Sequence, residues 1–163
     1  MVYLHQLAEH NLHPDAIRFL AFALPKRQAI WWACICTRIA HAALESIKPE
    51  QSEALAAAEA WVYKPNEENR RKAGLKSDQT DRQYPADWTA AAAFWSGGSI
   101  SPAGQPGVEP PDHLAPHAVA GAILLAAATD DSEALNQHYR DFLARGIDIA
   151  RGGKGFEPGQ VQP

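Results

Sequence analysis

Six prolines restrict the fold of this 163-residue chain more than any other feature, because each precedes a stretch of helix-forming residues. Proline is favoured in the first turn of a helix, where the amide proton that it lacks would have no acceptor. A seventh helix start is expected at Asp130, where Glu133 completes a capping-box-like pair ahead of Leu135. The six starts marked by proline are Pro14, Pro25, Pro49, Pro65, Pro85 and Pro116.

The expected helices differ in how deeply they are buried. The helix from Pro25 to about residue 47 has no polar side chain between Ala29 and Cys36, which is typical of a helix with neighbours on every side. In the helix from Pro49 to about residue 63, apolar residues recur at spacings of three and four and form one stripe toward the core. That stripe contains Ala54, Ala57, Ala58 and Trp61.

The helix from about residue 66 to residue 75 is mostly polar and is expected at the surface. It contains the basic run Arg70, Arg71 and Lys72, which directly follows Glu67, Glu68 and Asn69. Opposite charges this close on one helix are typical of a face exposed to solvent. We therefore interpret the cluster as a solvated helix face and assign it no chemistry.

A long segment rich in proline and glycine separates the last two helices from the others. Residues 99–116 carry five prolines and two glycines, so neither a helix nor a central strand persists there. Gly97-Gly98 ends the helix that begins at Pro85, and Gly152-Gly153 ends the last helix. No alternation of apolar and polar residues predicts a strand. The sequence predicts an all-α fold, a compact single-domain bundle of about seven helices over residues 1–153, with a disordered tail at 154–163.

Composition and charge exclude several classes of function. Hydrophobic residues make up 46% of the chain and charged residues 21%, as in globular domains that fold alone. The formal charge of −4 has the wrong sign for binding phosphate backbones, so no nucleic-acid partner is expected. The longest uncharged apolar run, residues 118–128, is shorter than the roughly 20 residues that cross a bilayer, so no membrane partner is expected either.

The cysteines and the first residues indicate the compartment. Cys34 and Cys36 are two apart on an expected helix, so their side chains diverge and do not pair. Two buried free thiols are typical of a reducing compartment. The early acidic residues Glu9 and Asp15, without a basic lead-in, argue against a targeting peptide. A cytoplasmic protein is expected.

Histidines are the best candidates for chemistry. His113 and His117 are four apart, a spacing that suits a metal on one helix face, but Pro116 lies between them and they lack the glutamate of a zinc-protease motif. His41 lies in the central helix, where a hydrogen-bonded core histidine is the simpler interpretation. We therefore expect no enzyme, no metal and no cofactor. A small metal-dependent enzyme that uses His41, His113 or His117 is the alternative.

The five tryptophans are the most informative residues. Trp31 and Trp32 are adjacent on one helix and must point in different directions. Core packing is the first interpretation for all five, because indole rings bury large areas. The functional alternative is an apolar groove beside the proline-rich segment that binds a protein partner. The candidate partner-binding residues there are Tyr84, Trp88, Trp95 and Ile100.

Four strings in the sequence carry a family resemblance. They are LPKRQAIWWA at residues 24–33, AWVYKPNEENRR at 60–71, FWSGGSI at 94–100 and GIDIARGG at 146–153. Through them, residues 14–153 resemble a family of small helical bacterial proteins met near type VI secretion genes. The chain also resembles the co-chaperone that accompanies a larger effector chaperone when a toxin is loaded onto the PAAR spike tip.

The resemblance implies a protein-binding function. The expected partner is a larger effector chaperone and, through it, a secreted toxin. An immunity protein that neutralises a toxin is the alternative of the same binding class. The resemblance identifies no catalytic or ligand-binding residue.

Overall fold

The computed structural model describes residues 6–7, 10–102, 104–129 and 134–155. These residues form seven α-helices and no strand, which confirms the all-α prediction. The helices are α2 (His13–Ala23), α3 (Lys26–Ala42), α4 (Pro49–Tyr63), α5 (Glu67–Asp78), α6 (Pro85–Phe94), α7 (Leu114–Ala127) and α8 (Leu135–Ala150).

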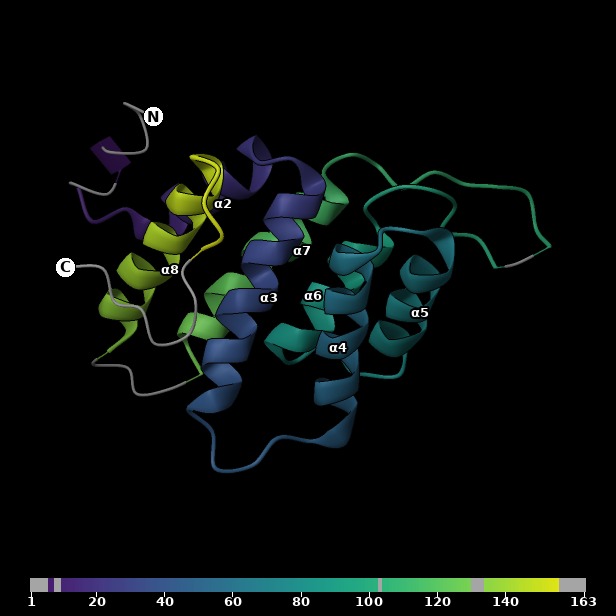
Figure 1. Cartoon of the computed structure of the whole chain (residues 1–163), viewed down its shortest axis with the longest axis horizontal. Coiled ribbons are helices and arrows are strands. Elements are labelled where there is room, and N and C mark those ends of the chain that lie inside the picture. Colours follow the sequence, from purple (N-terminus) through teal and green to yellow (C-terminus); the bar gives the residue numbers. More distant parts are fainter. Residues whose placement is uncertain (1–5, 8–9, 103, 130–133, 156–163) are drawn as a thin grey trace.

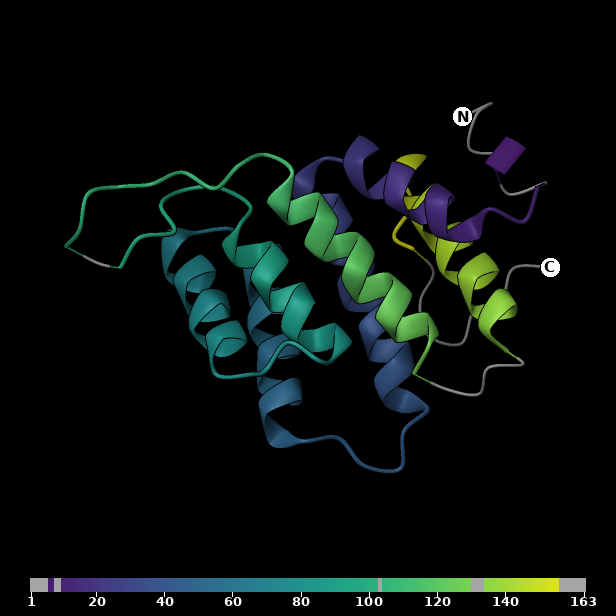
Figure 2. The ribbon, with the colours of Figure 1, turned by 180° about the vertical axis from the view of Figure 1, so that it is seen from behind.

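Helix α3 is the centre of the bundle and packs against α2, α4, α6, α7 and α8 (Figure 1). On the opposite side of the molecule, α7 runs between α6 and α2 (Figure 2). Helix α5 lies at one end, against α4 and α6, and α8 lies at the other end, against α2 and α3. No described helix is both long enough and apolar enough to cross a membrane.

Proline marks most of the helix starts, with two differences from the prediction. Helix α7 begins at Leu114, so Pro116 is its third residue and still falls in the first turn. Helix α5 begins at Glu67, because the side chain of Asn66 accepts the Asn69 amide at 2.8 Å and caps the helix after Pro65. Helix α8 begins at Leu135, and the expected start at Asp130 lies outside the described residues.

Small residues let the helices approach closely. All of Ala54, Ala57, Ala58 and Trp61 are buried, as their spacing predicts. Gly146 in α8 meets α2 and α3, since a Cβ atom there would lie 2.6 Å from the Trp32 ring and 2.7 Å from Leu20. Trp32 is itself fully buried and donates its indole N–H to the Phe142 carbonyl at 2.7 Å.

The prediction that α3 has neighbours on every side is wrong on one face. Trp32 is 0% exposed, whereas Trp31 is 37% exposed and Ile35 is half-buried. No described helix covers the Trp31 face. Instead, the backbone that follows α8 passes beside it (yellow in Figure 1), and the Trp31 indole N–H donates to the Lys154 carbonyl at 3.2 Å.

The proline-rich segment between α6 and α7 projects from the end of the bundle (Figures 1 and 2). Its base is held by backbone and hydroxyl contacts. The Ile100 amide donates to the Val108 carbonyl at 2.8 Å, and Ser99 Oγ accepts the amides of Ser101 and Val108, each at 3.1 Å. The described part of this segment is therefore a loop closed at its base.

Candidate functional site

The four residues predicted to bind a partner are all half-buried around α6. The Trp88 and Trp95 rings lie edge to face with centroids 6.4 Å apart, and Trp88 donates its indole N–H to the Arg82 carbonyl at 2.9 Å. The Arg82 guanidinium lies 5.3 Å from the Trp95 centroid. The structure therefore brings the two tryptophans together beneath an arginine.

The other two predicted residues, Tyr84 and Ile100, make different contacts from those of the tryptophan pair. Tyr84 is the N-cap residue of α6, and the Lys48 ammonium lies 5.0 Å from its ring centroid. Ile100 belongs to the base of the loop, where its amide is bonded to Val108. Whether these four residues bind a partner stays a prediction.

An apolar groove lies on the Trp31 face of α3, which no described helix covers. It has a volume of about 870 Å³. One wall is α3, the second is the C-terminal half of α4, and the third is the end of α8 with the residues that follow it. The lining residues are Pro25, Arg27, Gln28, Trp31, Arg38, Glu59, Val62, Tyr63, Ile149, Gly152 and Gly153.

Two exposed aromatic rings lie at the rim of the groove. Trp31 is 37% exposed and Tyr63, the last residue of α4, is 89% exposed. Arg27 fixes the end of α4 beside them, because its guanidinium donates to the carbonyls of Val62 at 2.7 Å and Tyr63 at 3.3 Å. A cation at the C-terminal end of a helix also interacts favourably with the helix dipole. Arg27 therefore holds the end of α4 in place, and the groove has an aromatic rim formed by Trp31 and Tyr63.

The third wall depends on how α8 ends. Gly153 donates to the Asp148 carbonyl at 2.9 Å and Gly152 to the Ile149 carbonyl at 3.0 Å, which is the Schellman arrangement, and Gly152 has a φ of 91°. The reversed chain then lies against the bundle: Gly155 donates to Asp148 Oδ2 at 2.8 Å and accepts from Arg145 at 2.9 Å.

These contacts bear on the tail predicted at residues 154–163. Lys154 and Gly155 belong to the folded body, because both make backbone hydrogen bonds to it. Residues 156–163 lie outside the described residues, so disorder there stays a prediction.

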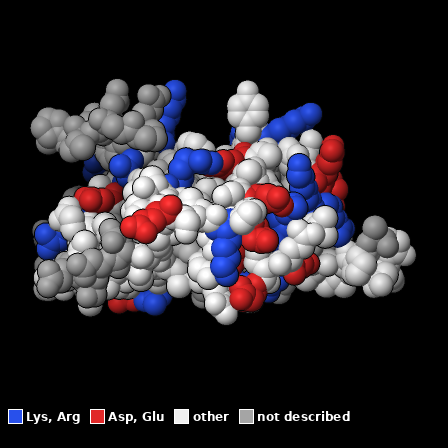
Figure 3. All heavy atoms as spheres, turned by 90° about the horizontal axis from the view of Figure 1, so that it is seen from below, with Lys and Arg blue, Asp and Glu red and all other residues white. Residues whose placement is uncertain are grey.

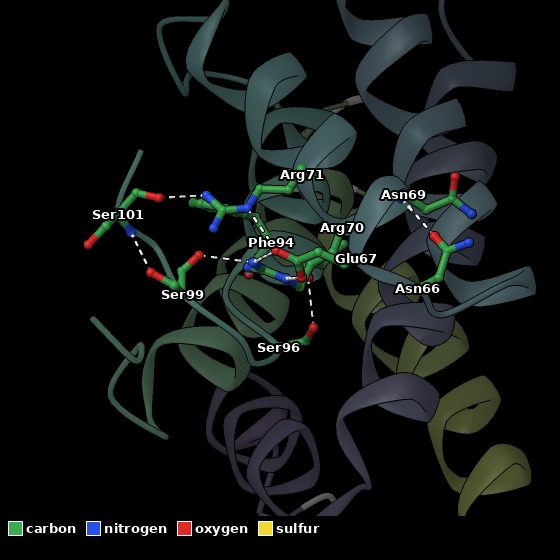
Figure 4. A network of polar contacts seen from close by, with 10 residues as sticks. Asn66, Glu67, Asn69, Arg70, Arg71, Phe94, Ser96, Ser99 and Ser101 are labelled. Atoms are coloured by element: carbon green, nitrogen blue, oxygen red, sulfur yellow. Dashed lines mark hydrogen bonds and ion pairs between the residues drawn. The ribbon is translucent and has the colours of Figure 1, made fainter. Parts of the chain in front are cut away.

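A polar network centred on Arg70 corrects the interpretation of the basic cluster as solvated (Figure 4). The Arg70 side chain is only 5% exposed. Its guanidinium donates to the carbonyls of Phe94 at 2.7 Å and Ser99 at 2.9 Å, and makes two bonds of 2.7 Å to the Glu67 carboxylate. Arg70 therefore joins α5 to the end of α6 and to the base of the loop.

The neighbours of Arg70 extend the network. Arg71 donates to Glu67 at 2.8 Å and to the Ser101 carbonyl at 2.6 Å. Hydrogen bonds from Arg70 above all, and then from Arg71, lower the pKa of Glu67 to about 2. Gly98 has a φ of 63°, and a Cβ atom there would lie 2.9 Å from the Arg70 guanidinium. Only the lysine of the basic run, Lys72, is exposed as predicted.

The model of one protein family matches residues 3–150, and that family is described as a family of unknown function, DUF6931. The chain belongs to DUF6931. No curated protein and no solved structure matches it. The description of DUF6931 gives no function, so the expected link to type VI secretion stays a prediction.

The three candidate histidines of this DUF6931 chain, His41, His113 and His117, do not form one site. His113 and His117 are brought together, with ring centroids 5.7 Å apart, and both are exposed. Lys26, the first residue of α3, is bonded to Asp112 at 3.0 Å, and the helix from Lys26 to His41 is roughly 22 Å long. His41 therefore lies at the other end of α3. Within the described residues, no three His, Cys, Asp or Glu side chains are arranged to hold a metal ion.

His41 is buried, as predicted, but it is not fully hydrogen-bonded. In the described part of the chain its Nε2 atom has no hydrogen-bond partner. Burial, and then the charge of Arg38, lower the pKa of His41. Its ring is therefore neutral near pH 7, which is the form that costs least in an apolar environment.

Proposed function

We propose that this DUF6931 protein is a protein-binding adaptor, and that it uses the groove beside Trp31 to hold its partner. The observation that carries the proposal is an apolar groove beside the central helix of the bundle, with two exposed aromatic rings, Trp31 of α3 and Tyr63 of α4. Exposed apolar patches of this kind mark protein interaction sites, and tryptophan and tyrosine are enriched among the residues that dominate binding energy.

The sequence resemblance gives the adaptor a context. We propose that it is a cytoplasmic co-chaperone that assists an effector chaperone in loading a toxin onto the PAAR spike tip of a type VI secretion system. Three of the strings that carry the resemblance supply groove residues: LPKRQAIWWA contains Trp31, AWVYKPNEENRR contains Tyr63, and GIDIARGG contains Gly152 and Gly153. AWVYKPNEENRR also contains the buried Arg70.

Co-expression with the products of neighbouring genes tests the proposal. We expect one of them, a larger chaperone, to co-purify with the wild-type chain in a stable complex, and Trp31→Ala to lose that complex while its melting temperature stays close to that of the wild type. Recovery of the wild-type chain only as a lone monomer, at micromolar concentrations of every neighbouring product, contradicts the proposal.

Co-expression with a neighbouring toxin separates an adaptor from an immunity protein. An immunity protein restores growth to cells that express a neighbouring toxin, whereas an adaptor changes how much toxin is loaded or secreted. We expect no rescue of growth when the chain is expressed with such a toxin.

A further inference from the structure

The face of α3 that lines the groove is a helix face without a helical neighbour. Residues 29–36 carry no charged side chain on any side, and a helix that is apolar all round is normally enclosed. Five helices pack on the other faces of α3. On the Trp31 face, the backbone at Lys154 and Gly155 lies beside the helix, α4 and the end of α8 form the walls of the groove, and Trp31 remains 37% exposed. One more helix would complete the enclosure.

The charged side chains and the indole N–H that line the groove already have partners inside the chain. Arg27 binds two carbonyls of α4, Arg38 binds Glu59 at 2.7 Å, and the Trp31 indole N–H is bonded to Lys154. The buried polar atoms that lack partners in the described part of the chain belong to His13, His41 and Asp87, and none of these residues lines the groove. A small polar ligand needs free groups that fix its orientation. This groove instead suits apolar side chains of a polypeptide.

The charge around the groove has the opposite sign to the charge of the chain. Among the lining residues and their immediate chain neighbours, six side chains are cations and two are carboxylates, whereas the whole chain carries −4. Lys64, Arg151 and Lys154 are exposed and form no ion pair within the described residues, and Lys26 is paired with Asp112. The cations are Lys26, Arg27, Arg38, Lys64, Arg151 and Lys154, and the carboxylates are Glu59 and Asp148.

The face seen in Figure 3 shows no comparable excess of positive charge. Seen from below the view of Figure 1, basic and acidic side chains are interspersed, without a broad region of one sign (Figure 3). An apolar floor with a basic rim is complementary to a segment that has an apolar stripe and acidic flanks.

We propose that the groove binds an acidic amphipathic helix of the partner protein, packed along α3 and α4 with its apolar side chains between Trp31 and Tyr63. Helix-in-groove docking uses apolar residues at spacings of three and four, and it would place a further helix at the usual 8 to 10 Å from α3. This inference rests on the proposed adaptor function and specifies the class of partner segment.

Two synthetic peptides test the inference on the full chain. Both have the same stripe of leucine and phenylalanine at helical spacing, and their remaining positions are glutamate in one and lysine in the other. The five tryptophans give separate indole N–H signals in a proton–nitrogen NMR spectrum, and Trp31→Phe identifies the signal of Trp31. We expect the glutamate peptide to shift the Trp31 signal before those of Trp88 and Trp95, and to bind about tenfold more tightly than the lysine peptide.

Charge reversal supplies a matched pair of variants. Arg151→Glu combined with Lys154→Glu removes the free cations at the third wall and should weaken binding of the glutamate peptide by about threefold to tenfold. Lys72→Glu reverses an exposed cation on α5, which contributes no residue to the groove, and should leave binding unchanged.

Each of three results overturns the inference. The NMR signal of the Trp31 indole does not shift at millimolar peptide, or both peptides bind with equal affinity. The third is that the Trp31 signal shifts when the protein concentration is raised in the absence of peptide. The last of these assigns the groove to a second copy of the chain. If both peptides fail while a neighbouring product still co-purifies in a manner that depends on Trp31, the acidic helix is wrong and the adaptor function stands.

Discussion

Arg70 is the residue whose role differs most from its appearance in the sequence. It sits in a run of charged residues, yet only 5% of its side chain is exposed, and its partners Phe94 and Ser99 are 24 and 29 positions away along the chain. Partners at that separation leave no local signal. Gly98 is the one hint, because a glycine beside a helix end can mark a backbone that another group approaches closely.

Loss of the Arg70 guanidinium should destabilise the fold. Arg70→Met leaves the carbonyls of Phe94 and Ser99 without their donor, and we expect the free energy of unfolding to fall by about 2 to 4 kcal/mol. Lys72→Met, two residues away and exposed, is the control and should change it by less than about 0.5 kcal/mol. Urea denaturation measures both, and equal effects would contradict a buried role for Arg70.

Glu67 should make stability depend on pH in the acid range. Its pKa is about 2 in the folded protein against 4.5 ordinarily, so its contribution is complete above about pH 4.5 and is lost as the pH falls through 2. Because the Glu67 side chain is 60% exposed, we expect only about 1 kcal/mol. Glu67→Gln should be less stable than the wild type at pH 7, and the difference should shrink toward pH 2. A constant difference across that range would contradict this account.

The two cysteines should be inert in the folded protein. Both are 0% exposed, and burial raises the pKa of each thiol far above its ordinary value, so neither forms the reactive thiolate. We expect Ellman's reagent to modify neither Cys34 nor Cys36 in mildly alkaline native buffer, and both in concentrated guanidinium chloride. Rapid reaction of either thiol in native buffer would disprove their burial.

At the scale of helices, the sequence was most informative where the signal is local. Proline and glycine act through their own backbone, so the starts of α4 and α6 and the end of α8 could be predicted within a residue or two. The groove could not be predicted, because its third wall is the chain beyond α8, and the contact between Trp31 and Lys154 joins positions 123 apart. The sequence predicts that Trp31 and Trp32 point in different directions, but it does not predict which of the two rings is exposed.

Two glycines in helices test the packing of α8 and α7. Gly146→Ala would place a methyl group against Trp32 and Leu20, and we expect a loss of about 1 to 3 kcal/mol in spite of the better helix propensity of alanine. In α7, a Cβ atom at Gly121 would meet nothing within 4 Å, so Gly121→Ala should stabilise the protein by up to about 1 kcal/mol. Thermal denaturation of both variants measures the contrast, and effects of the same sign would refute the close contact at Gly146.

At the scale of the whole molecule, the bundle separates the Arg70 network from the groove. The Arg70 network holds α5, α6 and the base of the loop at one end. The groove lies on the Trp31 face of α3, and its walls come from α3, α4 and the end of α8. Changes in the groove should therefore affect binding with little effect on folding, which is the behaviour expected of an adaptor.

The affinity for a co-purifying partner, measured by calorimetry with matched tryptophan variants, tests this account most directly. Trp31→Ser removes the exposed ring of the groove, and Trp95→Ser removes a half-buried ring of the Trp88–Trp95 pair. If the groove holds the partner, Trp31→Ser weakens binding by about thirtyfold or more, the loss typical of a central aromatic residue, and Trp95→Ser changes it little. Unchanged affinity in Trp31→Ser, or a larger loss in a folded Trp95→Ser variant, would contradict the account.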